Sequence, residues 1–169
     1  MAELTWLRSR HMELGADLET LRGTADGMDD STMLELWDRV TGHVSFLVHD
    51  LMPFVSVEEE ILYPALAVAA DTATPVDVLR AHQVEISRLA AELDEGRRSL
   101  PLGEEAGWRA VRRTLAGVHA IARLYFTVED EVILPLLESD LDPHEAEELE
   151  DALRAVARTN TTSHDFQQA

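Results

Sequence analysis

One eleven-residue pattern occurs twice in this chain, and it constrains the fold more than any other feature. The first copy, residues 54–64, reads FVSVEEEILYP, and the second, residues 125–135, reads YFTVEDEVILP. The copies are 71 residues apart, and the same spacing relates His11 to His82 and Trp37 to Trp108. Three separated landmarks at one spacing indicate an internal duplication of a structural unit. We therefore expect two related helical hairpins.

Hydrophobic residues recur at alternating spacings of three and four, which is the period of an amphipathic helix. The pattern predicts helices over residues 3–26, 31–70, 74–95 and 104–139. Pro53 lies inside the second of these and should kink it, because a proline removes a backbone hydrogen bond. The positions expected to face the core include Leu4, Leu7, His11, Leu34, Glu58, His82, Glu129, Val132 and Leu136.

The chain continues beyond the second repeat. Asp142-Pro143 predicts the start of a short fifth helix, which can pack on the bundle through Leu149, Leu153 and Val156. Since no strand pattern competes with the helices, the predicted fold class is all-α: an antiparallel four-helix bundle with a short C-terminal fifth helix. Residues 1–158 are expected to form this single domain, and residues 159–169 a flexible tail.

The composition excludes several classes of function. With 33 acidic residues against 14 Lys and Arg, the net charge of −19 disfavours binding to nucleic acid or to anionic membranes. The absence of cysteine excludes disulfides, zinc–thiolate sites, iron–sulfur clusters and thiol catalysis. The N-terminus has no signal pattern, and no uninterrupted apolar run has the length of a membrane span. We therefore expect a cytoplasmic protein.

Ionisable side chains at inward positions point to a chemical site. His11 and His82 form one pair related by the repeat, and Glu58 and Glu129 form the other. A buried carboxylate is costly unless it is paired, protonated or bound to a metal. Imidazoles and carboxylates from four helices are the ligands that bind iron, manganese or zinc inside a bundle. Glu59 and Asp130, at the edge of the stripe, could supply further carboxylates.

A metal-free interpretation stays open at this point. Each histidine could instead hydrogen-bond a glutamate, which would give a polar core layer that fixes the helix register. In addition, folding the second helix back on the first sets His11 opposite residues 46–50, short of Glu58. A displaced pocket built from His43 and His119 is a further alternative, although a core histidine bonded to a neighbour is the better interpretation of each.

The two acidic runs, together with His11 and His82, resemble the hemerythrin-like, or HHE cation-binding, family over roughly residues 8–138. The resemblance implies a four-helix bundle with a non-haem di-iron centre that binds oxygen, senses iron or oxygen, or handles peroxide and nitric oxide. The family's ligand pattern is a lone histidine followed by His-x-x-x-Glu, present twice. His11, Glu58, His82 and Glu129 match it, whereas Phe54 and Tyr125 stand where the other two histidines would be.

The leading hypothesis is therefore a hemerythrin-like protein with an altered, carboxylate-rich metal site. Its ligands would be His11, Glu58, His82 and Glu129, with Glu59 and Asp130 as bridging or supporting groups, around one or two iron ions or else manganese or zinc. It would sense or handle a small molecule such as oxygen, peroxide or nitric oxide, as a monomer or homodimer; as an enzyme, it would be a non-haem iron oxidoreductase. The alternative is a degenerate bundle without metal that acts as a ligand-binding or interaction module.

Overall fold

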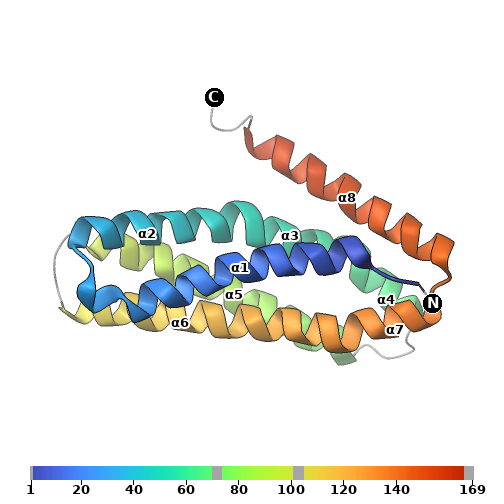
Figure 1. Cartoon of the computed structure of the whole chain (residues 1–169), viewed down its shortest axis with the longest axis horizontal. Helices are drawn as coiled ribbons and strands as arrows, with labels where there is room; N and C mark the ends of the chain where they lie inside the picture. The colour runs from blue at the N-terminus through green and yellow to red at the C-terminus, as the bar shows by residue number, and fades with distance from the viewer. Residues whose placement is uncertain (1, 70–73, 101–104, 166–169) are drawn as a thin grey trace.

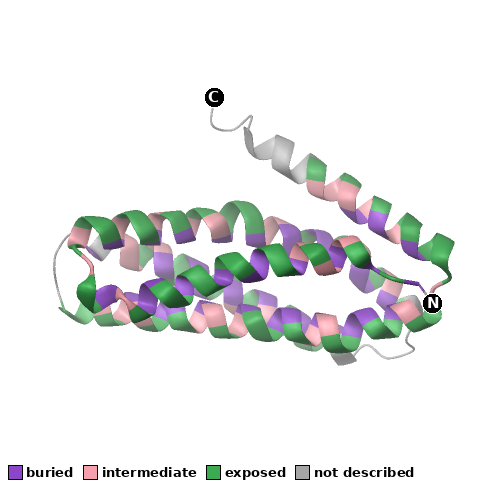
Figure 2. Ribbon diagram, in the orientation of Figure 1, coloured by how far each residue is buried: buried purple, intermediate pink, exposed green. Residues whose placement is uncertain are grey.

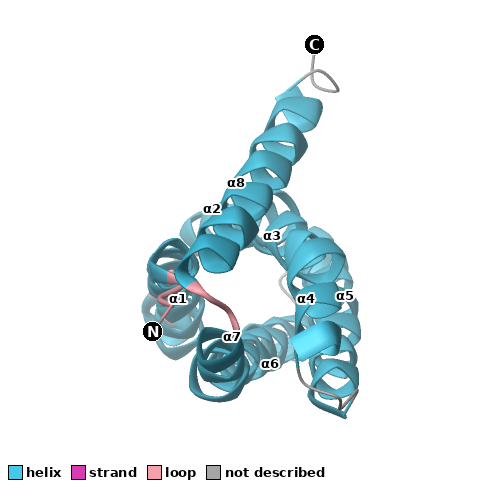
Figure 3. Ribbon diagram, turned by 90° about the vertical axis from the view of Figure 1, so that its right-hand side faces the viewer, coloured by secondary structure: helices cyan, strands magenta, loops and turns pink. Residues whose placement is uncertain are grey.

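The computed structural model describes residues 2–69, 74–100 and 105–165, and these residues form helices without a strand. Four helical rods run antiparallel around a common core (Figures 1 and 3). The first rod is α1 (Thr5–Asp26), and the third is α5 (Thr74–Ser99). The second contains α2 (Met33–Phe46), α3 (Met52–Val57) and α4 (Tyr63–Ala69), and the fourth contains α6 (Glu105–Val128) and α7 (Leu134–Asp140). The predicted four-helix bundle is confirmed.

Wide π-helical turns join the segments of the second and fourth rods. They span Leu47–Leu51, Glu58–Leu62 and Glu129–Ile133. The last two occupy equivalent positions of the repeat, and in each the closing N–H donates to the glutamate carbonyl five residues earlier, Tyr63 to Glu58 and Leu134 to Glu129. The two copies of the repeated sequence therefore share the same local distortion, and each distortion begins at the buried glutamate.

These turns correct part of the predicted core. A π-helical turn holds an extra residue, so the inward face moves on by one position after it. Val132 and Leu136, which were predicted to face inward, are exposed, whereas Ile133 and Leu137 are fully buried. Leu34 is also exposed, in the first turn of α2, while Leu36 is buried. The stripe of α1, in contrast, is buried as predicted, including Leu4, Leu7 and His11 (Figure 2).

The proline in the second rod follows a π-helical turn. Pro53 comes two residues after the turn Leu47–Leu51, in which Met52 donates its N–H to the Leu47 carbonyl. Because proline has no N–H, it interrupts the regular hydrogen-bonding ladder at this point, and widened turns are one of the ways in which a helix accommodates such a defect. The rod therefore continues from Met33 to Ala69 without leaving the helical conformation.

A C-terminal helix, α8 (Pro143–Asp165), completes the fold and is longer than the short helix predicted. It packs beside α3 and the turn Glu58–Leu62 and then diverges from the bundle (Figure 1). Leu153 is buried against the bundle, as predicted, and Leu149 and Val156 are partly buried there. The helix extends into the segment assigned to the tail, and residues 166–169 lie outside the described residues.

The predicted loops agree less closely with the structure. Helix α5 continues to Ser99, past the predicted loop start at Gly96, and residues 70–73 and 101–104 lie outside the described residues.

The segment Met33–Ala67 has the length and mean hydropathy of a membrane span. Its inward side chains nevertheless belong to the bundle core, and a core helix of a soluble protein has the same properties.

Two carboxylates complete the N-terminal end of α1, where Leu4 provides no side-chain cap. Glu150 of α8 accepts hydrogen bonds from the backbone N–H groups of Trp6, at 2.7 Å, and Leu7, at 3.3 Å. Glu138 of α7 accepts from the Leu4 N–H at 3.0 Å and forms an ion pair with Arg8. The N–H groups that begin a helix have no partners within it, so these contacts fix the end of the helix that carries His11.

We expect Glu150→Ala to lower the free energy of unfolding by about 0.5–2 kcal/mol, the usual cost of removing a capping acceptor. The exposed Glu147, on the same helix, provides the matched control, because Glu147→Ala should change stability by less than about 0.5 kcal/mol. Urea unfolding followed by circular dichroism measures both. Equal stabilities for the two variants would show that Glu150 does not support α1.

Candidate metal centre

A histidine and two glutamates meet in the core. His11 Nε2 lies 2.9 Å from Glu58 Oε1 and 3.4 Å from Glu129 Oε2. Both glutamates are fully buried, and His11 is only 3% exposed. One ligand atom from each of the three lies within 4.8 Å of the others, so the three side chains could hold one metal ion. They come from three of the four rods.

The direction of the side chains explains why His11 reaches Glu58, although a residue count along the two helices places His11 opposite residues 46–50. Helical side chains lean towards the N-terminus of their own helix. Because α1 and the second rod are antiparallel, the side chains of His11 and Glu58 lean towards each other. The glutamate adds the length of its side chain, and their contact at 2.9 Å shows that the gap is closed.

The two carboxylates predicted at the edge of the stripe have different surroundings. Asp130 Oδ1 lies 2.7 Å from His11 Nδ1, so this carboxylate holds the outer side of the imidazole. Its side chain is 38% exposed and reaches the protein surface. Glu59 points outward and pairs with Arg80 of α5 at 3.1 Å. Asp130 is therefore placed to orient His11, whereas Glu59 lies outside the cluster.

Helix α5 brings Gln83, rather than His82, to the centre. Gln83 is buried, and its Nε2 donates to the hydroxyl of Tyr63 at 2.8 Å and to that of Tyr125 at 3.3 Å. His82 is half-buried, its Nδ1 has no hydrogen-bond partner among the described residues, and it does not belong to the cluster of His11, Glu58 and Glu129. Its role as a ligand stays a prediction.

Two tyrosines join Gln83 to the carboxylates. Tyr125, which the resemblance puts at the position of a family histidine, donates its hydroxyl to Glu58 Oε2 at 2.6 Å. The hydroxyl of Tyr63 lies 2.8 Å from that of Tyr125 and 3.4 Å from Glu129 Oε1. Sequence reasoning missed both Tyr63 and Gln83, although Tyr63 lies at the end of the first repeat copy. Phe54, which the resemblance puts at the position of the other family histidine, packs edge-on against the His11 ring, with centroids 5.7 Å apart.

The electrostatics of the cluster favour a cation. Burial, and then the neighbouring charge of Glu58, raise the pKa of Glu129 well above its usual range. Burial lowers the pKa of His11, but hydrogen bonds to Asp130 and Glu58 outweigh it and raise this pKa to about 9. Glu129 Oε2 is buried and accepts no hydrogen bond from the described residues, although His11 Nε2 lies 3.4 Å away. The site therefore combines two buried carboxylates with one unsatisfied acceptor, and this donor set fits a metal ion.

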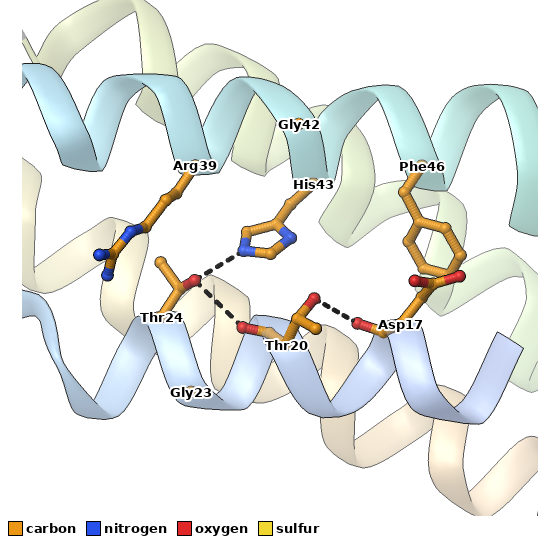
Figure 4. Close-up of a pocket in the computed structure, with 8 residues that line it drawn as sticks. All are labelled: Asp17, Thr20, Gly23, Thr24, Arg39, Gly42, His43 and Phe46. Atoms are coloured by element: carbon orange, nitrogen blue, oxygen red, sulfur yellow. Dashed lines mark hydrogen bonds between the residues drawn. The ribbon is translucent and has the colours of Figure 1, made fainter. Parts of the chain in front are cut away.

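The other inward histidines have partners of their own. His43 Nε2 lies 2.7 Å from Thr24 Oγ1, beside a surface hollow between α1 and α2, and Thr24 also donates to the Thr20 carbonyl (Figure 4). His119 Nε2 lies 3.1 Å from Glu19 Oε1. Each of these histidines bonds a neighbour on α1, which agrees with their interpretation as structural histidines rather than as parts of a displaced metal pocket.

Among protein-family models, that of the hemerythrin HHE cation-binding domain matches residues 3–137. This range includes the first three rods, most of the fourth and the three clustered side chains. No curated protein and no solved structure matches the chain.

The buried imidazole of His43 predicts acid sensitivity. Burial, and then the charge of Arg39, lower the pKa of His43 to about 4. Because this value lies below that of the unfolded chain, the contribution of His43 is complete above about pH 6.5 and is lost as the pH falls towards about 4. We expect His43→Gln to reduce the loss of unfolding free energy between about pH 7 and about pH 5 by about 1–2 kcal/mol.

Urea unfolding at both pH values measures this difference. The control is His144→Gln, at an exposed position on α8, which should keep the acid sensitivity of the unchanged protein. The same loss of stability in His43→Gln as in the control would show that His43 does not titrate in the folded state as described.

Proposed function

Because the chain belongs to the hemerythrin HHE cation-binding family, we propose that it is a non-haem iron protein that senses or handles a small molecule such as oxygen, peroxide or nitric oxide. The observation that carries the proposal is the contact of His11 with both Glu58 and Glu129 in the bundle core. Imidazole and carboxylate ligands suit iron, and manganese and zinc are the other candidates. Bound iron would supply one-electron redox chemistry.

The surrounding residues have supporting roles. Asp130 holds Nδ1 of His11, which leaves Nε2 directed at the carboxylates, and such an outer contact fixes both the tautomer and the ring orientation of a ligating histidine. Tyr125 similarly fixes one oxygen of Glu58. Phe126 packs on the His11 ring with centroids 4.8 Å apart, and with Phe54 it excludes water from the ligands.

Asp130 offers a route between the surface and the centre. It lines a hollow of about 620 Å³ beside the N-terminal part of α1, together with Arg8, Met12 and Glu138. A small molecule entering this hollow would meet Asp130 first and His11 behind it.

The second candidate function is a metal-free binding or interaction module. This candidate is favoured because most polar groups of the core have partners within the protein. His11 contacts three carboxylates, and Gln83 and the two tyrosines hydrogen-bond one another. In that case the aromatic side chains simply fill the space of lost ligands. Metal analysis separates this candidate from the first.

Iron content tests the assignment of ligands. After expression in iron-supplemented medium, the unchanged protein should contain iron, and His11→Ala should lose it. His82→Ala should keep it, because His82 lies outside the cluster. Elemental analysis of the purified proteins measures the content, and circular dichroism checks that each variant folds. Iron at the unchanged level in folded His11→Ala would contradict the site, and no metal in the unchanged protein would favour the metal-free module.

Reactivity tests the proposed sensing or redox role. The reduced, iron-loaded protein should change its absorption or electron paramagnetic resonance spectrum on exposure to at least one of oxygen, hydrogen peroxide and nitric oxide. His119→Ala, which removes a histidine paired with Glu19 outside the cluster, should respond in the same way. Unchanged spectra with all three molecules would contradict the role while leaving metal binding intact.

A further inference from the structure

The polar core has two chemically different halves. One half holds His11, Glu58 and Glu129, which are the three potential ligands in mutual contact. The other half, beside α5, holds Gln83, Tyr63 and Tyr125, which are all buried and contribute an amide and two phenols. The duplicated sequence would allow the two halves to be equivalent, but the structure places both buried carboxylates in one half and an amide and two phenols in the other, neutral half.

The hydrogen bonds of the neutral half point in one direction. Gln83 Nε2 lies 2.8 Å from the Tyr63 hydroxyl, 3.3 Å from that of Tyr125 and 3.5 Å from the Val55 carbonyl, and its two N–H hydrogens are shared among these three acceptors. The Tyr125 hydroxyl in turn donates to Glu58. Because the single Tyr125 hydrogen goes to Glu58, the Tyr63 hydroxyl donates to the Tyr125 oxygen at 2.8 Å, and Glu129 Oε1 lies further away, at 3.4 Å. A cation placed among them would compete with these hydrogen bonds for the lone pairs of the phenol oxygens.

The distribution of charge also disfavours a second metal ion in the neutral half. A divalent ion among the three ligands would be neutralised by the two buried carboxylates, and Asp130 adds a third negative charge behind His11. A second divalent ion would lie beside groups that are neutral at ordinary pH and would add positive charge without a counter-charge. In a buried site, uncompensated charge is strongly unfavourable.

We infer that the centre holds a single metal ion, bound by His11, Glu58 and Glu129, and that Gln83, Tyr63 and Tyr125 fill the place of a second ion. This inference rests on the proposed metal-binding function and defines its stoichiometry. The neutral half orients the carboxylates: Tyr125 holds Glu58 directly, and Gln83 holds Tyr125. Gln83 is thus a positioning residue, whereas His11 is a ligand.

Metal stoichiometry and position test this inference. The full chain is reconstituted with ferrous iron under anaerobic conditions, freed of excess metal by desalting, and assayed for iron per chain by elemental analysis. We expect about one iron per chain in the unchanged protein and in the matched variant His82→Gln, whose side chain lies outside the cluster. His11→Gln should have none. Anomalous diffraction from crystals of the loaded protein should show one iron peak beside His11 and none beside Gln83.

The possible outcomes distinguish the inference from the function on which it rests. About two irons per chain in the unchanged protein would overturn the single-ion inference but support metal binding. No iron in the unchanged protein would overturn the metal-binding function and the inference together. An anomalous peak beside Gln83 would place an ion in the neutral half and would also overturn the inference. The iron content of the unchanged protein tests the inference by itself, so the test still decides if a variant misfolds.

Discussion

The structure depends on the burial of two carboxylates on facing rods of the bundle. Glu58 and Glu129 are fully buried, and the imidazole of His11 lies between them and Asp130. Two like charges at this depth repel each other and lose their hydration, and for this reason the pKa of Glu129 is raised. The neighbouring groups all limit this cost: His11 contacts both carboxylates, Tyr125 donates to Glu58, and Tyr63 lies near Glu129.

The duplication accounts for the matching positions of the two carboxylates, and later divergence accounts for the different residues around them. Equivalent π-helical turns begin at Glu58 and Glu129 and keep the two carboxylates in matching positions. Divergence has affected the residues around them, because α1 supplies His11 while α5 supplies Gln83 at the centre. The imidazole therefore contacts the two carboxylates on one side, whereas the amide contacts two phenols on the other. The single-ion inference follows from this difference.

The sequence predicted the rods, the bundle and three of the clustered side chains because these depend on a hydrophobic period that is strong in each helix. It could not choose between His82 and Gln83. Leu79, His82, Ile86, Leu89 and Leu93 alternate by three and four residues, and so do Leu79, Gln83, Ile86, Ala90 and Leu93. Only packing against the other rods decides which is central. Likewise, the shift from Val132 to Ile133 depends on a π-helical turn, which a regular helical period does not reveal.

The most direct measurement compares thermal unfolding of the metal-free protein and of Glu58→Gln/Glu129→Gln, each with and without added ferrous iron under anaerobic conditions. Glutamine keeps the shape and removes the charge. If the buried carboxylates are kept for a cation, the metal-free variant should be more stable than the metal-free unchanged protein, and iron should stabilise only the unchanged protein. A variant that is less stable than the unchanged protein, with iron affecting neither, would contradict the account and leave the cluster as a structural polar core.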